Sequence, residues 1–341
     1  VLYAGLEQGV WFSLDRGSHW QSLRLNMPPV AVHDMRIQPQ RDDLMLATHG
    51  RGFWILDDVG AIAGLSKAVG SAAPTLFPLQ TAYTWYRWWT SYYGTHPDEC
   101  CLAAGMYSGE DPSEGSAITY YLPSRTHVRF EIFDETGTQV RCLEAPGDAG
   151  VMRTAWNLTE TPPVPWFHTR EWNRGGPGAT VIPGRYTVRM HAGSSLAETP
   201  LEVRPDPRAA WTIDKYIMRH RFVTKLNEEL SAIDIALNRL DSLATGSSFD
   251  KLRMTRDKLS LTRLFTSGVV NSEDDLLKPD GLRERLTILQ GTLALSQGPP
   301  TPAQEGAANS IHAQFEIAMN AYQSFLQAHH LPPDSSQEGC R

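Results

Sequence analysis

Residues 2–17, "LYAGLEQGVWFSLDRG", and residues 44–60, "LMLATHGRGFWILDDVG", are two copies of one pattern. Each copy has a strand-like segment, a turn with glycine, a second strand-like segment and an acidic turn that ends in glycine. At an offset of 43 residues the matching pairs are Ala4 with Ala47, Gly9 with Gly52, Val10 with Phe53, Trp11 with Trp54, Phe12 with Ile55, Asp15 with Asp58, and Gly17 with Gly60. A repeat of about 40–45 residues is typical of the four-stranded blades of a β-propeller. We therefore predict that residues 1–73 comprise the last one or two blades of a propeller together with a linker.

The first copy ends in "SLDRGSHW", residues 13–20, which has the spacing S-x-D-x-G-x-x-W of an Asp-box. Its four defining residues are Ser13, Asp15, Gly17 and Trp20. Asp15 can accept hydrogen bonds from turn amides, Gly17 can adopt a positive φ, and Trp20 can fill the space between sheets. We therefore assign these four residues a structural role.

The two motifs together resemble those of the BNR/Asp-box propellers, a superfamily that includes sialidases, sortilin-type (VPS10) receptors and bacterial proteins labelled glycosyl hydrolase. The stretch "ATHGRGFWILDD", residues 47–58, is similar to the end of the last blade in exported bacterial members. The resemblance implies that the Asp-box lies at the periphery of the blade, away from the ligand face. It also implies an extracytoplasmic location: secreted, periplasmic or in the cell envelope.

The chain departs from the family pattern in two places. His19 stands where a Thr or Ser usually precedes the Trp, and the second copy has Leu56 and Ala63 in place of the Ser and the Trp. The second copy is therefore expected to be a degenerate closing blade.

Length, charge and cysteine content limit the classes of protein that remain. The chain has 341 residues, which is enough for two or three domains. Its net charge of −7 and the absence of a Lys/Arg-rich run argue against nucleic-acid binding, and no apolar run approaches the roughly 20 residues of a membrane span. The cysteines lack metal-ligand spacing and leave the compartment and the disulfide pairing open; they are Cys100, Cys101, Cys142 and Cys340. Because the chain opens inside an expected strand, we expect it to be the C-terminal part of a longer protein.

Residues 74–205 are expected to form an immunoglobulin-like β-sandwich with an aromatic N-terminal connection. Six alternating segments between residues 117 and 205 predict strands: "AITYYL", "HVRFEIFD", "TQVRCLEA", "MRTAWNL", "GRYTVRMH" and "TPLEVRP". The pieces "GSAITYYL", "FEIFDETGTQVR" and "PGRYTVRM" are similar to an accessory sandwich in the same bacterial family. Residues 61–80 are interpreted as a linker, and residues 161–180 as a long exposed loop that contains His168, Arg170 and Glu171. The aromatic-rich residues 82–93 fit either a surface that stacks on sugars or a strand between domains.

Residues 206–335 are expected to form a three-helix bundle. Asp206 followed by Pro207 has the pattern of a helix start, and apolar residues recur at steps of three and four around residues 226–240, 282–293 and 311–325. The tandem heptad "DKLRMTR" and "DKLSLTR", residues 250–263, predicts a loop insertion at 245–275. The expected fold class is thus multidomain, with all-β propeller blades and a sandwich followed by an α-helical bundle.

No catalytic constellation can be assigned to this chain. Glycosidases need carboxyls that face each other across the scissile bond, and the sialidase set of arginines, nucleophile and acid cannot be matched to any residue here. No metal or cofactor motif occurs either, so we expect neither and leave open whether the protein is an enzyme. The candidate ligand-binding residues are His33, Asp34, His49 and Arg51, because propellers bind ligands where inner strands and their loops line the channel. In the alternative interpretation Asp34 pairs with Arg51 and the histidines are structural.

Two functional hypotheses from different classes follow from these patterns. In the first, the chain is part of an exported BNR-repeat propeller that binds a glycan or a protein without catalysis, or acts as a scaffold. In the second, it is the accessory tail of a sialidase-like glycoside hydrolase whose catalytic residues lie in upstream blades. A further possibility is that the helices mainly drive dimerisation.

Overall fold

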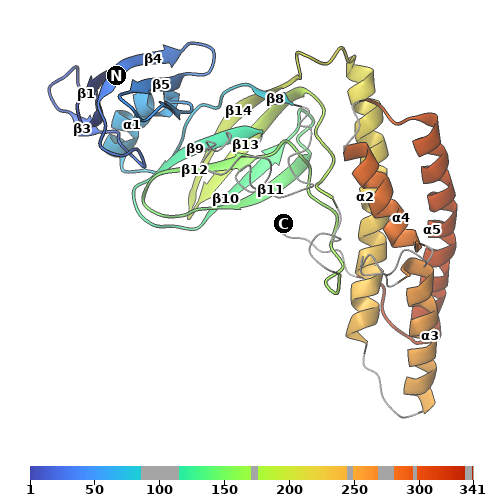
Figure 1. The fold of residues 1–341 in the computed structure, drawn as a ribbon. Helices are drawn as coiled ribbons and strands as arrows, with labels where there is room; N and C mark the ends of the chain where they lie inside the picture. The colour runs from blue at the N-terminus through green and yellow to red at the C-terminus, as the bar shows by residue number, and fades with distance from the viewer. Residues whose placement is uncertain are drawn as a thin grey trace. The chain divides into compact units, whose positions relative to one another are not determined.

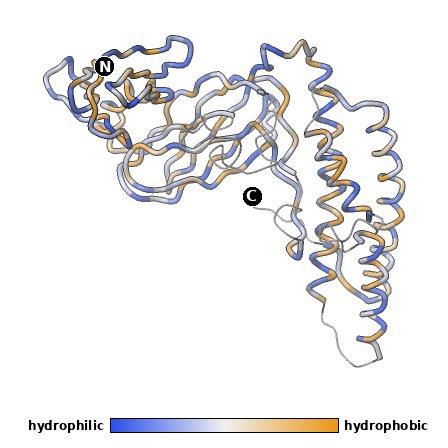
Figure 2. The backbone as a smooth tube through the Cα atoms, in the orientation of Figure 1, coloured by the Kyte–Doolittle hydropathy of each residue, from blue (hydrophilic) through white to orange (hydrophobic). Residues whose placement is uncertain are grey.

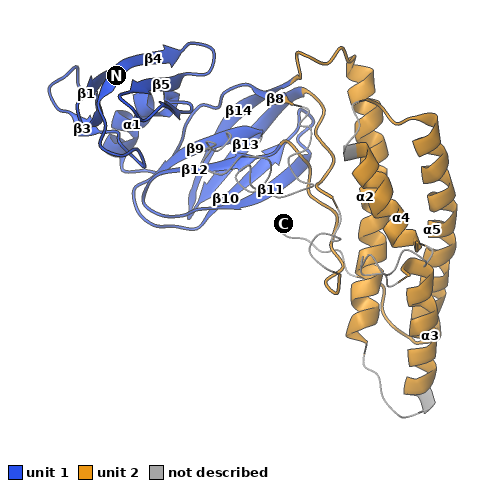
Figure 3. Cartoon of the chain, in the orientation of Figure 1, with its two compact units in different colours: residues 1–83, 105–157, 184–204 blue, residues 84–104, 158–183, 205–341 orange. Residues whose placement is uncertain are grey.

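The computed structural model describes residues 1–85, 115–169, 176–243, 249–267, 280–294, 298–334 and 340. These residues divide into two compact units (Figure 3). Unit 1 contains the described parts of Val1–Tyr83, Gly105–Asn157 and Gly184–Arg204, and unit 2 those of Thr84–Ala104, Leu158–Pro183 and Pro205–Arg341. Unit 1 is β-rich and unit 2 is mostly helical, so a β-rich part followed by helices is confirmed.

The N-terminal part of unit 1 consists of two three-stranded antiparallel sheets (Figure 1). The first sheet has the order β1(Leu2–Leu6), β2(Gly9–Ser13), β3(Gln21–Ser22), and the second has the order β4(Val32–Gln38), β5(Asp43–Thr48), β6(Phe53–Leu56). The β1–β2 and β5–β6 hairpins are the two copies of the sequence repeat. Leu2 lies opposite Ser13 and Leu44 lies opposite Leu56, so the strand register makes Leu2 equivalent to Leu44. The sequence offset of 43 holds for β2 and β6 but is 42 for β1 and β5, because the β5–β6 connection is one residue longer.

One hydrophobic core joins the two sheets. Val10 from β2 packs with Leu44 and Leu46 from β5, and partly buried Tyr3 and Trp54 extend this cluster. Gly5 of β1 faces Val32 of β4 so closely that a Cβ at Gly5 would overlap with the valine side chain. The face of the first sheet that contains Val10 therefore packs against the face of the second sheet that contains Leu44 and Leu46.

The expected linker after the second copy is wrong for its first half, which forms helix α1(Gly60–Ser71). Ala61 and Ala68 of this helix are buried with Phe77. The small residues that indicated a linker instead allow the helix to approach its neighbours closely.

The remainder of unit 1 is made of two further antiparallel sheets. One has the order β11(Gln139–Ala145), β10(Val128–Phe133), β13(Gly184–Ala192), β14(Ser195–Pro205), β8(Ala82–Thr84), and the other has β12(Gly150–Trp156), β9(Ser116–Leu122), β7(Thr75–Leu76). All six strands predicted between residues 117 and 205 are confirmed. The rings of Tyr120 and Phe130 lie 5.3 Å apart and those of Trp156 and Tyr186 lie 5.5 Å apart, so the inner faces of the two sheets are in contact.

The described helices of unit 2 are α2(Ile213–Ser242), α3(Phe249–Phe265), α4(Leu282–Ala294) and α5(Pro302–Ala328). They share one core, which includes Leu230, Phe265, Leu286 and Tyr322, and Figure 2 shows the hydrophobic residues along them. Helix α3 lies within the range that we expected to be a loop, and its Leu261 and Phe265 are buried in that core. The tandem heptads are therefore helical, and the described part of unit 2 has four helices where we expected three.

The predicted helix start at Asp206 is wrong, because α2 begins at Ile213 after Thr212. Asp206 is buried and its carboxylate accepts hydrogen bonds from the Arg208 guanidinium, with the Nη2–Oδ2 distance at 2.7 Å. This carboxylate therefore forms an ion pair and does not cap the helix.

The expected exposed loop at 161–180 is also wrong for its first part, which lies along α2. We call residues 160–169 the strap. Strap main-chain amides donate to α2 side chains: Val164 to Ser231, Trp166 to Asp234, and Phe167 to Asn238. Of the polar residues expected there, Arg170 and Glu171 lie outside the described residues, as do residues 86–93 of the aromatic segment.

Candidate functional site

The candidate ligand-binding residues lie at one end of the second N-terminal sheet. Strand β4 begins at Val32 opposite Thr48, and the turn between β5 and β6 follows at the same end. His33 and His49 are thereby brought together, with their exposed rings 5.0 Å apart and tilted by 34°. The main-chain amide of His49 donates to the carbonyl of Ala31 at 2.9 Å, which holds the turn against the start of β4.

The turn that carries Arg51 is fixed by its backbone. Gly50 and Gly52 both have a φ of 71°, a conformation that favours glycine. The hydroxyl of Thr48 donates to the carbonyl of Gly52 at 2.7 Å, and the indole of Trp54 donates to the carbonyl of Arg51 at 3.1 Å. The exposed Arg51 side chain therefore belongs to a well-defined turn that also carries His49.

The alternative pairing of Asp34 with Arg51 does not occur among the described contacts. Asp34 instead accepts a hydrogen bond from the amide of Met35 at 2.9 Å and forms an exposed ion pair with Arg36 at 3.6 Å. Asp34 therefore lies beside the histidine pair without being joined to it. Two imidazoles and a guanidinium offer donors to a ligand that is rich in hydroxyl or carboxylate oxygens.

In the Asp-box turn Asp15 accepts from a turn amide and Gly17 has a φ of 98°, as expected, whereas the bonds of the Ser13 hydroxyl were not predicted. The Ser13 hydroxyl donates to Asp15 at 2.9 Å and accepts from the amide of Gly17 at 2.8 Å. The amide and the imidazole of His19 both contact the Asp15 carboxylate, at 2.9 Å and 2.5 Å, and these hydrogen bonds lower the pKa of Asp15 to about 2. His19 therefore binds Asp15 with both its main-chain amide and its side chain, at the position where the motif usually has Thr or Ser.

The Trp20 of the Asp-box is less enclosed than we expected. Its side chain is 40% exposed and lies near Gly17 instead of filling a closed space between sheets. The turn follows the end of β2 at which Ser13 pairs with Leu2. In the second sheet the equivalent end is the one opposite to His33 and His49.

Three further groups bear on function. In the strap, the imidazole of His168 and the indole of Trp166 both contact the carboxylate of Asp241, at 2.6 Å and 2.7 Å. These contacts hold the strap against α2, so we assign His168 a structural role.

Cys142 and Cys340 are disulfide-bonded, whereas Cys100 and Cys101 lie outside the described residues. Within the described ranges no three His, Cys, Asp or Glu side chains are grouped so that they could hold a metal ion.

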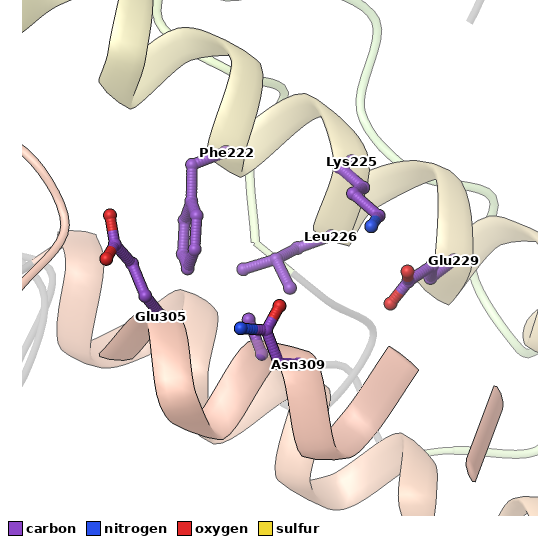
Figure 4. A pocket seen from close by; sticks show the side chains of 7 residues that line it. Phe222, Lys225, Leu226, Glu229, Glu305 and Asn309 are labelled. Carbon is purple, nitrogen blue, oxygen red and sulfur yellow. The ribbon is translucent and has the colours of Figure 1, made fainter. Parts of the chain in front are cut away.

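Sequence reasoning missed a hollow of about 240 Å³ between α2 and α5 (Figure 4). It is lined by Phe222, Lys225, Leu226, Glu229, Glu305, Ala308 and Asn309. One signal was present in the sequence, since Glu229 follows Leu226 by three residues and so falls on the apolar face of α2. The structure shows that Glu229 is buried there. A carboxylate at such a position is unusual unless it has a partner.

Comparison with known proteins adds no family to these observations. No family model matches the chain, and no curated protein matches it either. None of the helices that the structure describes is both long enough and apolar enough to cross a membrane.

Proposed function

We propose that the two N-terminal sheets are consecutive blades of an Asp-box β-propeller, and that this propeller serves in non-catalytic binding. The first argument is the equivalence of the sheets. The β1–β2 hairpin corresponds to the β5–β6 hairpin. The first sheet has one further strand after this hairpin, β3, and the second sheet has one further strand before it, β4. Together the two sheets therefore define a repeat of four antiparallel strands in sequence order. Four antiparallel strands in sequence order are the blade of a propeller.

The second argument is the way in which the sheets stack. The face of the first sheet that contains Val10 covers the face of the second that contains Leu44. These are different faces of the repeat, because the residue equivalent to Val10 is Phe53 and the residue equivalent to Leu44 is Leu2. A head-to-tail contact of this kind generates a ring when the rotation between copies closes.

The third argument, which carries the proposal, is that both outer faces are apolar and open. Val10 is 1% exposed but its equivalent Phe53 is 83% exposed, and Leu44 is 2% exposed but its equivalent Leu2 is 46% exposed. Ile55 and Leu6 add to these two faces. Burying a large apolar side chain is worth about 1.5–3 kcal/mol, so each outer face favours a further sheet.

The ligand end of such a propeller would be the one that holds His33, His49 and Arg51. These exposed donors, together with the turn that positions them, support binding of a glycan or an acidic surface of a protein. The disulfide-bonded Cys142 supports an extracytoplasmic location, because disulfides persist mainly in oxidising compartments. The paired sheets after residue 115 are proposed to be an immunoglobulin-like accessory module, supported by their alternating strands.

The stacking argument is tested with two double variants, Leu2→Ser with Leu6→Ser and Phe53→Ser with Ile55→Ser. Each variant loses one of the two complementary faces and retains the other. In sedimentation velocity we expect the unmodified chain to associate with rising concentration, each double variant to be monomeric, and an equimolar mixture of the two to form a 1:1 dimer. Ile317→Ser, which alters an exposed apolar residue of α5, serves as the control and should associate like the unmodified chain. A chain that stays monomeric at all concentrations would refute the proposal.

The binding role is tested separately on a glycan array and by release of reducing sugar. We expect retention of a glycan that is lost in the triple variant His33→Ala, His49→Ala, Arg51→Ala and kept in Arg36→Ala, without hydrolysis. Turnover of the bound glycan would instead favour the hypothesis of a glycoside hydrolase.

A further inference from the structure

The hollow between α2 and α5 is lined by apolar and by charged side chains. The apolar lining residues, which we call the floor, are Phe222, Leu226 and Ala308, and the charged ones include Lys225 and Glu305, whose side chains are drawn in Figure 4. A cavity of about 150 Å³ can hold a benzene-sized molecule, so 240 Å³ leaves room for a small organic ligand.

One lining residue is a buried carboxylate with an incomplete set of hydrogen bonds. The Glu229 side chain is 6% exposed, and its Oε1 accepts from Nδ1 of His312 at 2.7 Å. Among the described residues Glu229 forms no other hydrogen bond, and it lines the hollow. Removing a carboxylate from water is less costly when both of its oxygens accept hydrogen bonds, so Glu229 favours a further hydrogen-bond donor in the hollow.

The other lining groups select the charge of that donor. Glu305 adds a second carboxylate, the Phe222 ring offers a face that attracts cations, and Asn309 offers an amide oxygen. Lys225 is the single cation of the lining, and its exposed side chain can extend into solvent. The lining therefore has a net negative charge over an apolar floor.

From these contacts we infer that the hollow between α2 and α5 binds a small ligand that carries an ammonium group on a short apolar body. The ammonium donates to the carboxylate of Glu229 and lies against Phe222, while the apolar body covers Leu226 and Ala308. This site belongs to the helical unit and is independent of the proposed propeller.

The test is a titration of the whole chain with n-butylammonium, n-butanol and butyrate, followed by nuclear magnetic resonance. Saturable shifts are expected for butylammonium and not for butyrate. Glu229→Gln should weaken butylammonium binding roughly ten- to hundredfold, because it removes a charge-assisted hydrogen bond. The variant keeps an oxygen that accepts from His312, so its thermal unfolding should match that of the unmodified chain.

Three variants complete the design. Glu228→Gln changes an exposed neighbour outside the hollow and should leave the affinity unchanged. Lys225→Met should tighten butylammonium binding, because it removes the like charge, and Glu305→Gln should weaken it. The inference is overturned if butylammonium does not saturate, which would mean that the hollow holds water only. It is equally overturned if butyrate binds and loses affinity in Lys225→Met, or if Glu228→Gln and Glu229→Gln have the same effect.

Discussion

The ion pair between Asp234 and Arg283 should be the most sensitive electrostatic contact of the helical unit. Both side chains are fully buried, with Nε–Oδ1 and Nη2–Oδ2 distances of 2.6 Å and 3.0 Å. Asp234 also accepts the main-chain amide of Trp166 at 3.0 Å, so the pair links α2, α4 and the strap. Asp234→Asn keeps an acceptor for that amide but removes the charge that compensates Arg283.

Breaking a buried pair from one side costs about 3–5 kcal/mol, a large part of the roughly 5–15 kcal/mol that stabilises a domain. We expect Asp234→Asn to lower the free energy of unfolding by that amount. Arg283→Met leaves the carboxylate alone, and burial raises the pKa of Asp234. A raised pKa means that the folded chain binds the proton more tightly than the unfolded chain, so Arg283→Met should regain stability as the pH falls from 7 toward 5.

The assay is urea unfolding followed by far-ultraviolet circular dichroism, on both single variants and on the double variant. The double variant should lose less than the sum of the single losses, by more than about 1 kcal/mol. Glu228→Ala, an exposed change on the same helix, should alter stability by less than about 0.5 kcal/mol. Single variants that lose under about 1 kcal/mol and add without coupling would refute the reasoning.

The other predictions concern separate parts of the chain. The pKa of Asp15, measured from its carboxyl resonance, should be about 2, so its contribution to stability is present above the ordinary pKa and is lost as the pH falls through about 2. His19→Ala should raise the pKa of Asp15, and an unchanged pKa would contradict the contact with His19. Phe265→Ala should cost about 3–5 kcal/mol in urea unfolding, whereas the exposed Leu259→Ala should cost less than about 0.5 kcal/mol; equal losses would argue against packing of α3 in the core. Gly115→Ala should destabilise unit 1 by at least about 2 kcal/mol, because a Cβ there collides with a main-chain oxygen of β12 and φ is 81°; an unchanged melting temperature would contradict this.

Local patterns in the sequence were sufficient to predict the strands and helices in which apolar residues recur at a regular period. The alternating strands β9 to β14 and the apolar stripes of α2, α4 and α5 were found because period two and period 3.6 are visible in a single chain. Helix α1 was missed because Gly64, Gly70 and neighbouring small residues are typical of linkers, and its stability comes from burial of Ala61 and Ala68. The strap was missed because its order depends on α2 side chains more than 60 residues away.

The candidate sites divide in the same way. The Asp-box turn is local, so its spacing was enough to predict that Asp15 accepts from a turn amide and that Gly17 has a positive φ, but the two bonds of the Ser13 hydroxyl were missed. The contact of His33 with His49 depends on the register of β4 and β5, and the sequence indicated only that both lie near strand ends. The ion-pair partner of Asp34 is Arg36 on its own strand and not Arg51. The spacing of these residues in the sequence does not distinguish between the two arginines.

The tandem heptad of α3 shows how a helix can gain length without losing its partners. Thr255 and Thr262, which hold the same position in the two copies, each donate to the carbonyl four residues earlier, at 2.8 Å and 2.9 Å. Seven residues add about 10.5 Å to a helix but turn its apolar stripe by only about 20°. Leu252 and Leu259 are accordingly both exposed, while Met254 packs against the core in which Leu261 is buried. Duplication by whole heptads is thus a change that this bundle can tolerate, whereas a gain of two or five residues would rotate Phe265 out of the core.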